Sequence, residues 1–169
     1  DLLYWNSDGT NMPAGIHRYV MRNFYLDNKL RESDALTLGG VSIDMKKVKT
    51  PTYVVATMED HIAPWKTCYE VTQLFSGPVR FVLGESGHIA GVVNPPQKNR
   101  YGYWTNSKKH KSAQAWLESA TRSPGSWWSD WNEWIGKYAG ARVEPRDPAQ
   151  GPLPVLGDAP GSYVLKTLD

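Results

Sequence analysis

Two residues of this sequence have the types and the spacing that acid–base catalysis needs, Asp60 and His88. Each follows a stretch that predicts a buried β-strand, Thr52–Thr57 before Asp60 and residues 79–83 before His88. If these strands are parallel neighbours, both side chains emerge at the carboxyl edge of the sheet, where α/β proteins bind ligands. There a carboxylate can fix the tautomer of an imidazole, and the imidazole can take a proton from a nucleophile. The pair therefore predicts the acid and the base of a nucleophilic triad.

The sequence contains no convincing nucleophile for this pair. Cys68, the single cysteine, falls in the middle of a predicted helix, where we interpret it as a small apolar core residue. No Gly-x-Ser-x-Gly or Gly-x-Cys-x-Gly turn is present, and Gly84-Glu85-Ser86-Gly87 has the wrong spacing. Because α/β-hydrolases carry their triad in the order nucleophile, acid, histidine, we expect the nucleophile upstream of Asp60.

Other interpretations of these residues stay open. An aspartate after a strand often caps the next helix, although Asp60 lies four residues before Pro64, an awkward spacing for a cap. A metal site from Asp60, His61 and His88 lacks the ligand spacing of known zinc motifs, so we predict no metal. His110 lies in a lysine-rich run that we interpret as a solvated turn.

The elements that must position Asp60 and His88 follow a strand–helix–strand order. Residues 64–75 predict a helix between the two strands, which indicates α/β architecture with a parallel sheet. Gly84 and Gly87 bracket the histidine and give its loop a permissive backbone. Further elements are expected on either side: helices at 14–26, 112–121 and 126–139, a short hairpin or an irregular edge at 36–43, and an extended proline-rich tail at 141–161. The 126–139 helix carries four tryptophans, which we expect to pack on the sheet.

Length and composition exclude several classes of protein. The chain has 169 residues, of which 40% are hydrophobic and 21% charged, as in one globular domain. A net charge of +2 does not indicate the strongly basic surface that nucleic-acid binding requires. No apolar run reaches the roughly 20 residues of a membrane span, and no signal peptide opens the chain. One cysteine excludes an internal disulfide, and we expect a cytoplasmic protein.

The sequence motifs around Asp60 and His88 resemble those of poly(3-hydroxyalkanoate) synthases. The opening Asp-Leu-Leu-Tyr-Trp-Asn-Ser-Asp-Gly-Thr-Asn-Met-Pro is similar to a phrase of that family. Residues 59–65 resemble the phrase with the family's catalytic aspartate, and residues 81–96 the phrase with its catalytic histidine. Further matching phrases lie at 104–106, 125–128 and 159–164. The single-subunit synthases are the most similar, class I more than class II.

This resemblance implies a fold and a domain organisation. The fold would be α/β, the C-terminal portion of an α/β-hydrolase-like core, with part of the cap region at its N-terminal end. Residues 1–36 would form the cap-derived segment and the return to the core. Residues 37–140 would form the core with the Asp and His loops and the tryptophan-rich helix, and residues 141–169 the tail.

The resemblance also implies an activity, the polymerisation of (R)-3-hydroxyacyl-CoA into polyester with release of coenzyme A. His88 would activate a cysteine that lies upstream of Asp1, and Asp60 would orient His88 or assist deprotonation of the 3-hydroxyl group. Substrate-binding roles would fall to four residues: Trp5, His61, Ile89 and Asn28. The segment alone would be inactive. The alternatives are another α/β-hydrolase, such as an esterase or depolymerase, and a non-catalytic granule-binding homologue.

The expected partners follow from the same family. They are the acyl-CoA substrate, the growing polyester, a second copy in a homodimer, and polymer granules in the cytoplasm with their associated proteins. Coenzyme A enters as part of the substrate and leaves as a product, so no separate cofactor is expected. Neither nucleic acid nor a membrane span is expected.

Overall fold

The two strands predicted on either side of Asp60 form the parallel pair of the sheet. In the computed structural model, which describes residues 7–166, β3 (Thr52–Thr57) lies parallel to β4 (Val79–Gly84). Val54 faces Phe81 across the pair, and Thr57 faces Gly84. β3 begins and ends where predicted, and β4 extends one residue further than predicted. This register brings the carboxyl ends of both strands to the same edge.

The other half of the sheet is antiparallel, which corrects the prediction of a parallel sheet. β5 (Gly102–Thr105) runs antiparallel to β4, and β6 (Thr121–Pro124) runs antiparallel to β5. The strand order is β3–β4–β5–β6. The helix predicted at 112–121 is the shorter α6 (Ala113–Glu118), because Ser112 caps its start and β6 takes the residues after its end.

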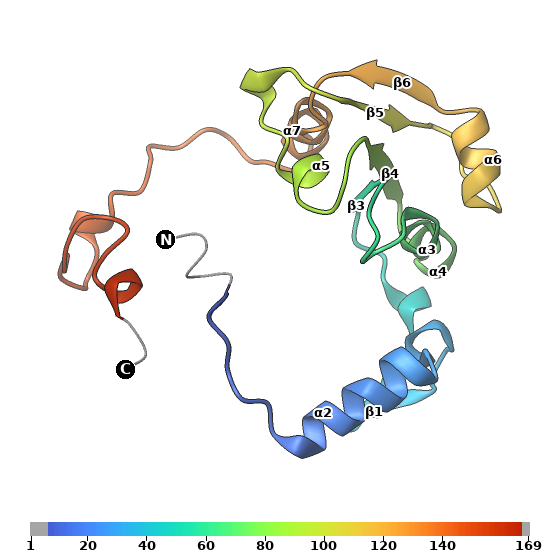
Figure 1. Ribbon diagram of the computed structural model, residues 1–169, viewed down its shortest axis with the longest axis horizontal. Coiled ribbons are helices and arrows are strands. Elements are labelled where there is room, and N and C mark those ends of the chain that lie inside the picture. The colour runs from blue at the N-terminus through green and yellow to red at the C-terminus, as the bar shows by residue number, and fades with distance from the viewer. Residues whose placement is uncertain (1–6, 167–169) are drawn as a thin grey trace. The chain divides into compact units, whose positions relative to one another are not determined.

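One face of the sheet carries the hydrophobic core. The helix predicted at 64–75 forms two short helices, α3 (Trp65–Tyr69) and α4 (Val71–Leu74), which join at Glu70. The ring of Phe81 on β4 lies edge-on to Tyr69 of α3 and to Trp116 of α6, with centroids 5.1 and 5.0 Å apart. All three side chains are buried. Figure 1 shows α3, α4 and α6 on the same side of the β3–β4 pair.

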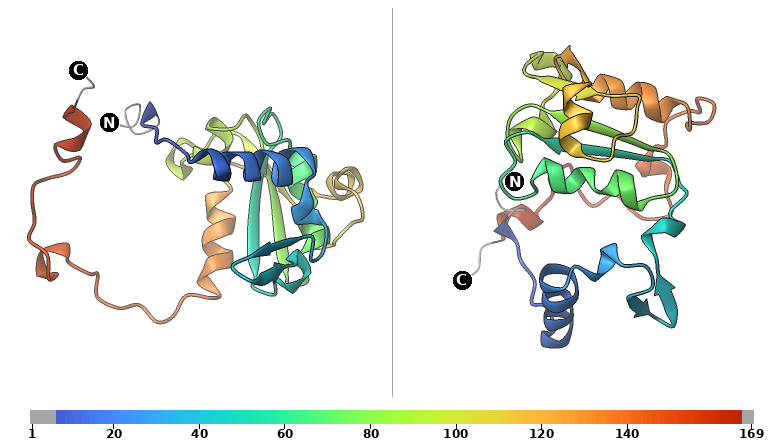
Figure 2. Two further views of the ribbon diagram at one scale, coloured as in Figure 1. Left: turned by 90° about the horizontal axis from the view of Figure 1, so that it is seen from below. Right: turned by 90° about the vertical axis from the view of Figure 1, so that its right-hand side faces the viewer.

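The opposite face is covered by the tryptophan-rich helix α7 (Trp128–Gly136). The Tyr53 ring of β3 lies 5.2 Å from that of Trp134, and Figure 2 shows α7 alongside the strands. This contact is also ionic: Asp130 accepts hydrogen bonds from Tyr53 and Arg80 at 2.8 and 2.7 Å. The predicted apolar face is therefore only partly right, since Trp128 keeps 39% of its surface exposed.

Shorter elements connect the sheet to the rest of this unit. The predicted hairpin is confirmed as β1 (Leu36–Leu38) and β2 (Val41–Ile43), whose turn residues Gly39 and Gly40 have φ values of 56° and 78°. Two such left-handed residues are what a type I′ turn requires. The remaining short elements are the π-helical η1 (Met21–Leu26), the 3₁₀ turns η2 (Lys29–Arg31), η3 (Met45–Lys47) and η4 (Pro96–Lys98), and α5 (Ala90–Val93).

The chain divides into two units, residues 21–139 with the sheet, and residues 1–20 with 140–169. In the second unit α2 (Ala14–Val20) begins where the helix at 14–26 was predicted. The predicted tail is irregular apart from η5 (Pro148–Gln150) and η6 (Tyr163–Leu165), and the hydroxyl of Tyr163 donates to Asp8 at 2.6 Å. None of the helices in residues 7–166 has the length and apolarity to cross a bilayer.

Candidate active site at the carboxyl ends of β3 and β4

The loops after β3 and β4 are joined to each other by their backbones. The Met58 amide donates to the Gly84 carbonyl at 2.8 Å, and the Glu59 amide donates to the Ser86 carbonyl at 3.0 Å. The strand pairing thus continues past the ends of both strands. It holds the loop that contains Asp60 against the loop that leads to His88.

Asp60 uses its two carboxylate oxygens for two tasks. Oδ1 accepts hydrogen bonds from the amides of Ile62 and Ala63 at 2.9 and 2.8 Å. Oδ2 lies 2.8 Å from Nδ1 of His88. The Asp60 side chain is 7% exposed and the His88 side chain 45%. The carboxylate is therefore fixed within the loop, while the imidazole that it orients remains open to a reactant.

These contacts fix the charge of Asp60 and the tautomer of His88. The Ala63 amide is the largest cause of a lowered Asp60 pKa, and the bonds from His88 and Ile62 add to it against the opposing effect of desolvation, so that the pKa falls to about 2. Asp60 is therefore ionised at neutral pH. Because an ionised carboxylate only accepts hydrogen bonds, Nδ1 of His88 carries the hydrogen. In the neutral ring Nε2 then keeps its lone pair, as a general base requires.

The capping interpretation of Asp60 and the catalytic one are compatible in this geometry. Asp60 caps the turn of residues 61–63 and not the helix α3, whose start has no side-chain cap. That turn aims Oδ2 at His88. Within residues 7–166 no group of three His, Cys, Asp or Glu side chains is arranged to hold a metal ion.

The backbone of the histidine loop differs from the prediction. The left-handed residue is Ser86, with a φ of 71°, and neither Gly84 nor Gly87 adopts a positive φ. The glycine that the site needs is Gly91, at the start of α5, because a Cβ there would collide with the Glu85 carbonyl and with Thr57. Sequence alone gave no signal that the helix after His88 approaches its own loop so closely.

The predicted substrate-binding residues are placed at different points. His61 and Ile89 are exposed and directly follow Asp60 and His88, with Ile89 at 72% exposure. Asn28 is exposed at the start of η2, on an element separate from both loops, with a left-handed φ of 48°. Trp5 lies outside the described residues. The roles of all four stay predictions.

Cys68 has the environment of a packed thiol. It is half-buried on α3 beside the hydrophobic core, and its Sγ donates to the Ala63 carbonyl at 3.5 Å. Burial and the charge of Asp60 raise the pKa of the Cys68 thiol. Since the thiolate is the nucleophilic form, a raised pKa is unfavourable for catalysis.

The cavity lined by α3, α4 and β4 does not belong to this site. It begins at Val79 and Pro78, at the amino end of β4, whereas Asp60 and His88 follow the carboxyl ends of the strands. His88 of the pair is instead 45% exposed, and exposed apolar residues follow shortly in the sequence, Ile62 after Asp60, and Ile89 and Val93 after His88.

Comparison with known proteins finds long matches to polymerases and a short match to a hydrolase. The poly(3-hydroxyalkanoate) polymerase of Methylorubrum extorquens is 48% identical over 165 residues, which are 97% of this chain and 27% of the polymerase. The poly(3-hydroxyalkanoate) polymerase subunit PhaC of Rhizobium etli is 46% identical over 98% of this chain and 26% of its own length. A putative carbamate hydrolase, RutD of Pseudomonas syringae, is 28% identical over 69 residues, 41% of this chain and 27% of the hydrolase. No family model matches the sequence.

The two polymerases match the chain almost from end to end, at identities far above chance similarity. The chain spans about a quarter of the length of the curated relatives that it matches. Over nearly all of its residues, this chain is homologous to one segment of the poly(3-hydroxyalkanoate) polymerases, about a quarter of their length.

Proposed function

We propose that this chain supplies the acid and the base of a Cys-His-Asp triad in an enzyme that polymerises (R)-3-hydroxyacyl-CoA, with 3-hydroxybutyryl-CoA as the expected substrate. The observation that carries the proposal is the 2.8 Å contact between His88 Nδ1 and Asp60 Oδ2, at neighbouring strand ends of a polymerase homologue. Asp60 orients His88 and balances its charge, and Nε2 of His88 is the base.

In the proposed chemistry the same nitrogen twice accepts a proton and passes it on. First, Nε2 takes the proton of the cysteine thiol, and the thiolate attacks the thioester carbonyl. Coenzyme A leaves as a thiolate and receives the proton back from His88, while the acyl group stays on the cysteine. Next, His88 takes the proton of a 3-hydroxyl group, whose oxygen attacks an acyl thioester and forms the ester bond. The displaced thiolate regains the proton, so protons and bonds balance in each cycle.

The nucleophile of this triad is proposed to lie outside residues 1–169. Cys68, with its raised pKa and its packed position, is a poor candidate. β3 has an almost continuous apolar sequence, typical of a strand that is buried on both faces inside a parallel sheet. Within the described chain β3 pairs with β4 alone. We propose an α/β-hydrolase-like sheet that continues beyond β3, with the cysteine at the carboxyl end of a neighbouring parallel strand.

The surroundings of the pair fit a site that further protein or substrate covers. Ile62, Ile89 and Val93 expose 65, 72 and 57% of their surfaces. Apolar side chains this exposed around two polar residues are typical of an interaction site. We propose that Trp5, His61, Ile89 and Asn28 contact the substrate. The complete enzyme is proposed to act as a homodimer on cytoplasmic polyester granules.

The experiment that tests the proposal replaces His88 by alanine in a polymerase that contains this chain. Without the base we expect thiol release and polymer formation to fall by about a thousandfold or more, with an unchanged circular dichroism spectrum. The matched control is His17→Ala, which removes an exposed histidine of α2 and should leave activity near normal. Near-normal turnover by His88→Ala would refute the assignment of the base.

A second candidate function is ester or amide hydrolysis, which the partial similarity to a carbamate hydrolase favours. Mass spectrometry of the complete protein after incubation with 3-hydroxybutyryl-CoA separates the possibilities. An acyl adduct on a cysteine and a growing oligomer support the polymerase. Release of free 3-hydroxybutyrate without oligomer supports a hydrolase, and no turnover supports a granule-binding homologue. The isolated 169 residues should release no thiol, and turnover by them would contradict an external nucleophile.

A further inference from the structure

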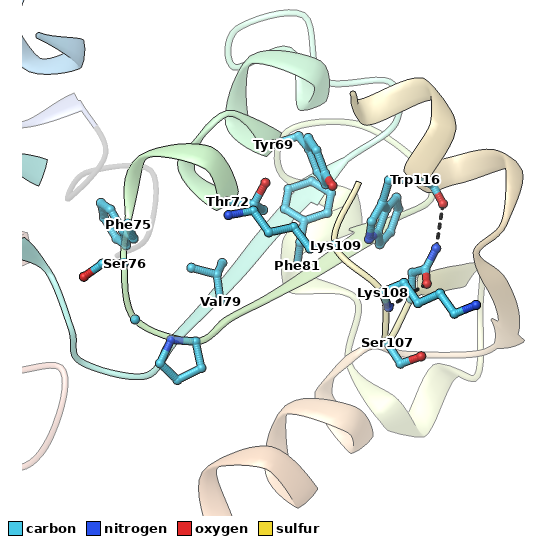
Figure 3. Close-up of a pocket in the computed structure, with 13 residues that line it drawn as sticks. Tyr69, Thr72, Phe75, Ser76, Val79, Phe81, Ser107, Lys108, Lys109 and Trp116 are labelled. Carbon is cyan, nitrogen blue, oxygen red and sulfur yellow. Dashed lines mark hydrogen bonds between the residues drawn. The ribbon is translucent and has the colours of Figure 1, made fainter. Parts of the chain in front are cut away.

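A cavity of about 380 Å³ opens at the amino end of β4, away from Asp60 and His88. Its floor is made of the buried rings of Tyr69, Phe81 and Trp116, and Phe75 adds a further aromatic wall (Figure 3). The volume is within the usual range of about 300–1,000 Å³ for small-molecule sites. The three floor rings are only 1–3% exposed, so the apolar surface that a ligand can reach comes from the half-buried Phe75 and Val79.

The cavity also carries positive charge. Lys108 and Lys109 line it, and its lining contains no aspartate or glutamate. Among the described residues, neither ammonium group forms an ion pair with a carboxylate. A neighbouring hollow of about 360 Å³ shares Asn106, Ser107 and Lys108 with the cavity and likewise lacks an acidic side chain. The charge at this end is complementary to an anion.

Hydrogen bonds to two residues of the cavity floor hold both ends of the segment that carries the two lysines. The side chain of Asn106 accepts from the Lys108 amide at 2.9 Å and donates to the Trp116 carbonyl at 3.0 Å. At the other end, the Tyr69 hydroxyl donates to the His110 carbonyl at 2.9 Å and accepts from the His110 amide at 3.1 Å. The lysines therefore extend from a fixed loop, which lowers the entropy lost when they bind a ligand.

We propose that this cavity binds a small amphiphile with an anionic head, whose apolar part contacts Phe75 and Val79 above the buried rings and whose head is held by Lys108 and Lys109. A carboxylate and a phosphate monoester share this chemistry. The site lies at the opposite end of the strands from the Asp60–His88 pair. Its existence is therefore independent of the proposed function, and either can fail without the other.

Titration of the full chain with decanoate, below its micelle concentration and at low ionic strength, tests the proposal. Calorimetry should give a saturable one-to-one isotherm, and the indole N–H resonance of Trp116, assigned with Trp116→Phe, should shift. The Trp127 indole, which donates to the Gly91 and Val92 carbonyls, should stay in place. Decyl phosphate in a parallel titration decides the head group: whichever anion binds more tightly identifies it, and decyltrimethylammonium should bind at least tenfold more weakly.

Two variants test the assigned residues. Lys108→Ala/Lys109→Ala should weaken decanoate binding about tenfold or more, since charge-assisted contacts are lost. The matched control Lys46→Ala/Lys47→Ala removes an adjacent lysine pair on η3 and should leave binding unchanged. Ser107→Trp, at an exposed position of the rim, should block the cavity without unfolding. The proposal is overturned if neither anion shifts the Trp116 resonance, if the cationic amphiphile binds equally well, or if both lysine pairs have the same effect.

Discussion

The two ends of the β3–β4 pair differ in how far this chain encloses the residues that lie there. At the carboxyl end, polar loops hold Asp60 and His88 in register, yet His88 is 45% exposed and exposed apolar residues follow shortly in the sequence. At the amino end, the chain closes a cavity with its own rings and fixes the loop at its rim. The carboxyl end thus presents an exposed hydrogen-bonded pair, whereas the amino end has the walls of a cavity.

Different kinds of contact hold the residues in place at the two ends. The geometry of the acid–base pair depends on backbone contacts between two loops, which need no enclosed volume. The geometry of the cavity depends on packed aromatic side chains and on side chain–backbone bonds that reach across the sequence. Substitutions at the two ends should therefore act through different mechanisms.

The largest effect on stability is expected for Gly91→Ala at the carboxyl end. A Cβ at Gly91 would lie 2.5 Å from Cγ2 of Thr57 and collide with the Glu85 carbonyl, both parts of the framework of the site. Overpacking of this kind costs about 3 kcal/mol of the free energy of unfolding. Urea denaturation measures the change. The control Gly136→Ala, in α7 with nothing within 4 Å of its Cβ, should instead stabilise by about 0.5 kcal/mol. Equal effects of both substitutions would show that the approach of α5 is not tight.

A smaller loss is expected at the amino end for Tyr69→Phe. It removes both hydrogen bonds to the His110 backbone, while Gln73 still donates to the His110 carbonyl at 2.8 Å. The free energy of unfolding should fall by about 1–2 kcal/mol. Tyr101→Phe, at a residue with 42% exposure, should change it by less than about 0.5 kcal/mol. If the loop is the anchor of the cavity, Tyr69→Phe should also weaken decanoate binding, and unchanged binding would contradict that link.

Acidification should weaken the carboxyl end through Asp60. The pKa of Asp60 falls from 3.8 to about 2 on folding, so its stabilising effect is fully present above about pH 4 and is lost as the pH drops towards 2. Asp60→Asn should remove this part of the pH dependence. The difference between the denaturation midpoints of the two proteins, measured from pH 6 to pH 2, should therefore shrink on acidification. A difference that is constant over this range would contradict the lowered pKa.

The smallest effect is expected for Gly87→Ala, which tests where the histidine loop is constrained. Gly87 has no positive φ, and the nearest atom to a Cβ there is the Glu59 carbonyl oxygen at 3.8 Å. The free energy of unfolding should change by less than about 0.5 kcal/mol. A loss above 1 kcal/mol in thermal or urea denaturation would show that the loop needs a glycine at this position, as the sequence had indicated.

The Asp60–His88 pair could be predicted from sequence because its signals are local. Each residue follows a strand with a strong apolar pattern, and parallel pairing brings consecutive strand ends together. The hairpin at Gly39 and Gly40 was predictable for the same reason, since its turn is specified by two adjacent glycines. These features need no knowledge of distant contacts.

The antiparallel half of the sheet could not be predicted in this way, because its strands have no strong local sequence pattern. β5 and β6 have four residues each, and β6 contains an arginine, a serine and a proline. Such strands form because distant partners supply their hydrogen bonds, as in the pairing of Trp104 with Arg122. The same holds for His110, which we had interpreted as part of a solvated turn. Its backbone is bound by Tyr69, 41 residues away, a contact that no local pattern encodes.

The position of β3 at the end of the sheet has a practical consequence for handling this chain by itself. Within residues 7–166, one side of this strand pairs with no other strand, and its sequence, Thr-Tyr-Val-Val-Ala-Thr, is free of charge and proline. Edges of this kind recruit the edges of other molecules and seed aggregates. Solutions of the separate segment should therefore be prone to concentration-dependent precipitation, and a charged substitution on that strand would be the first remedy to try.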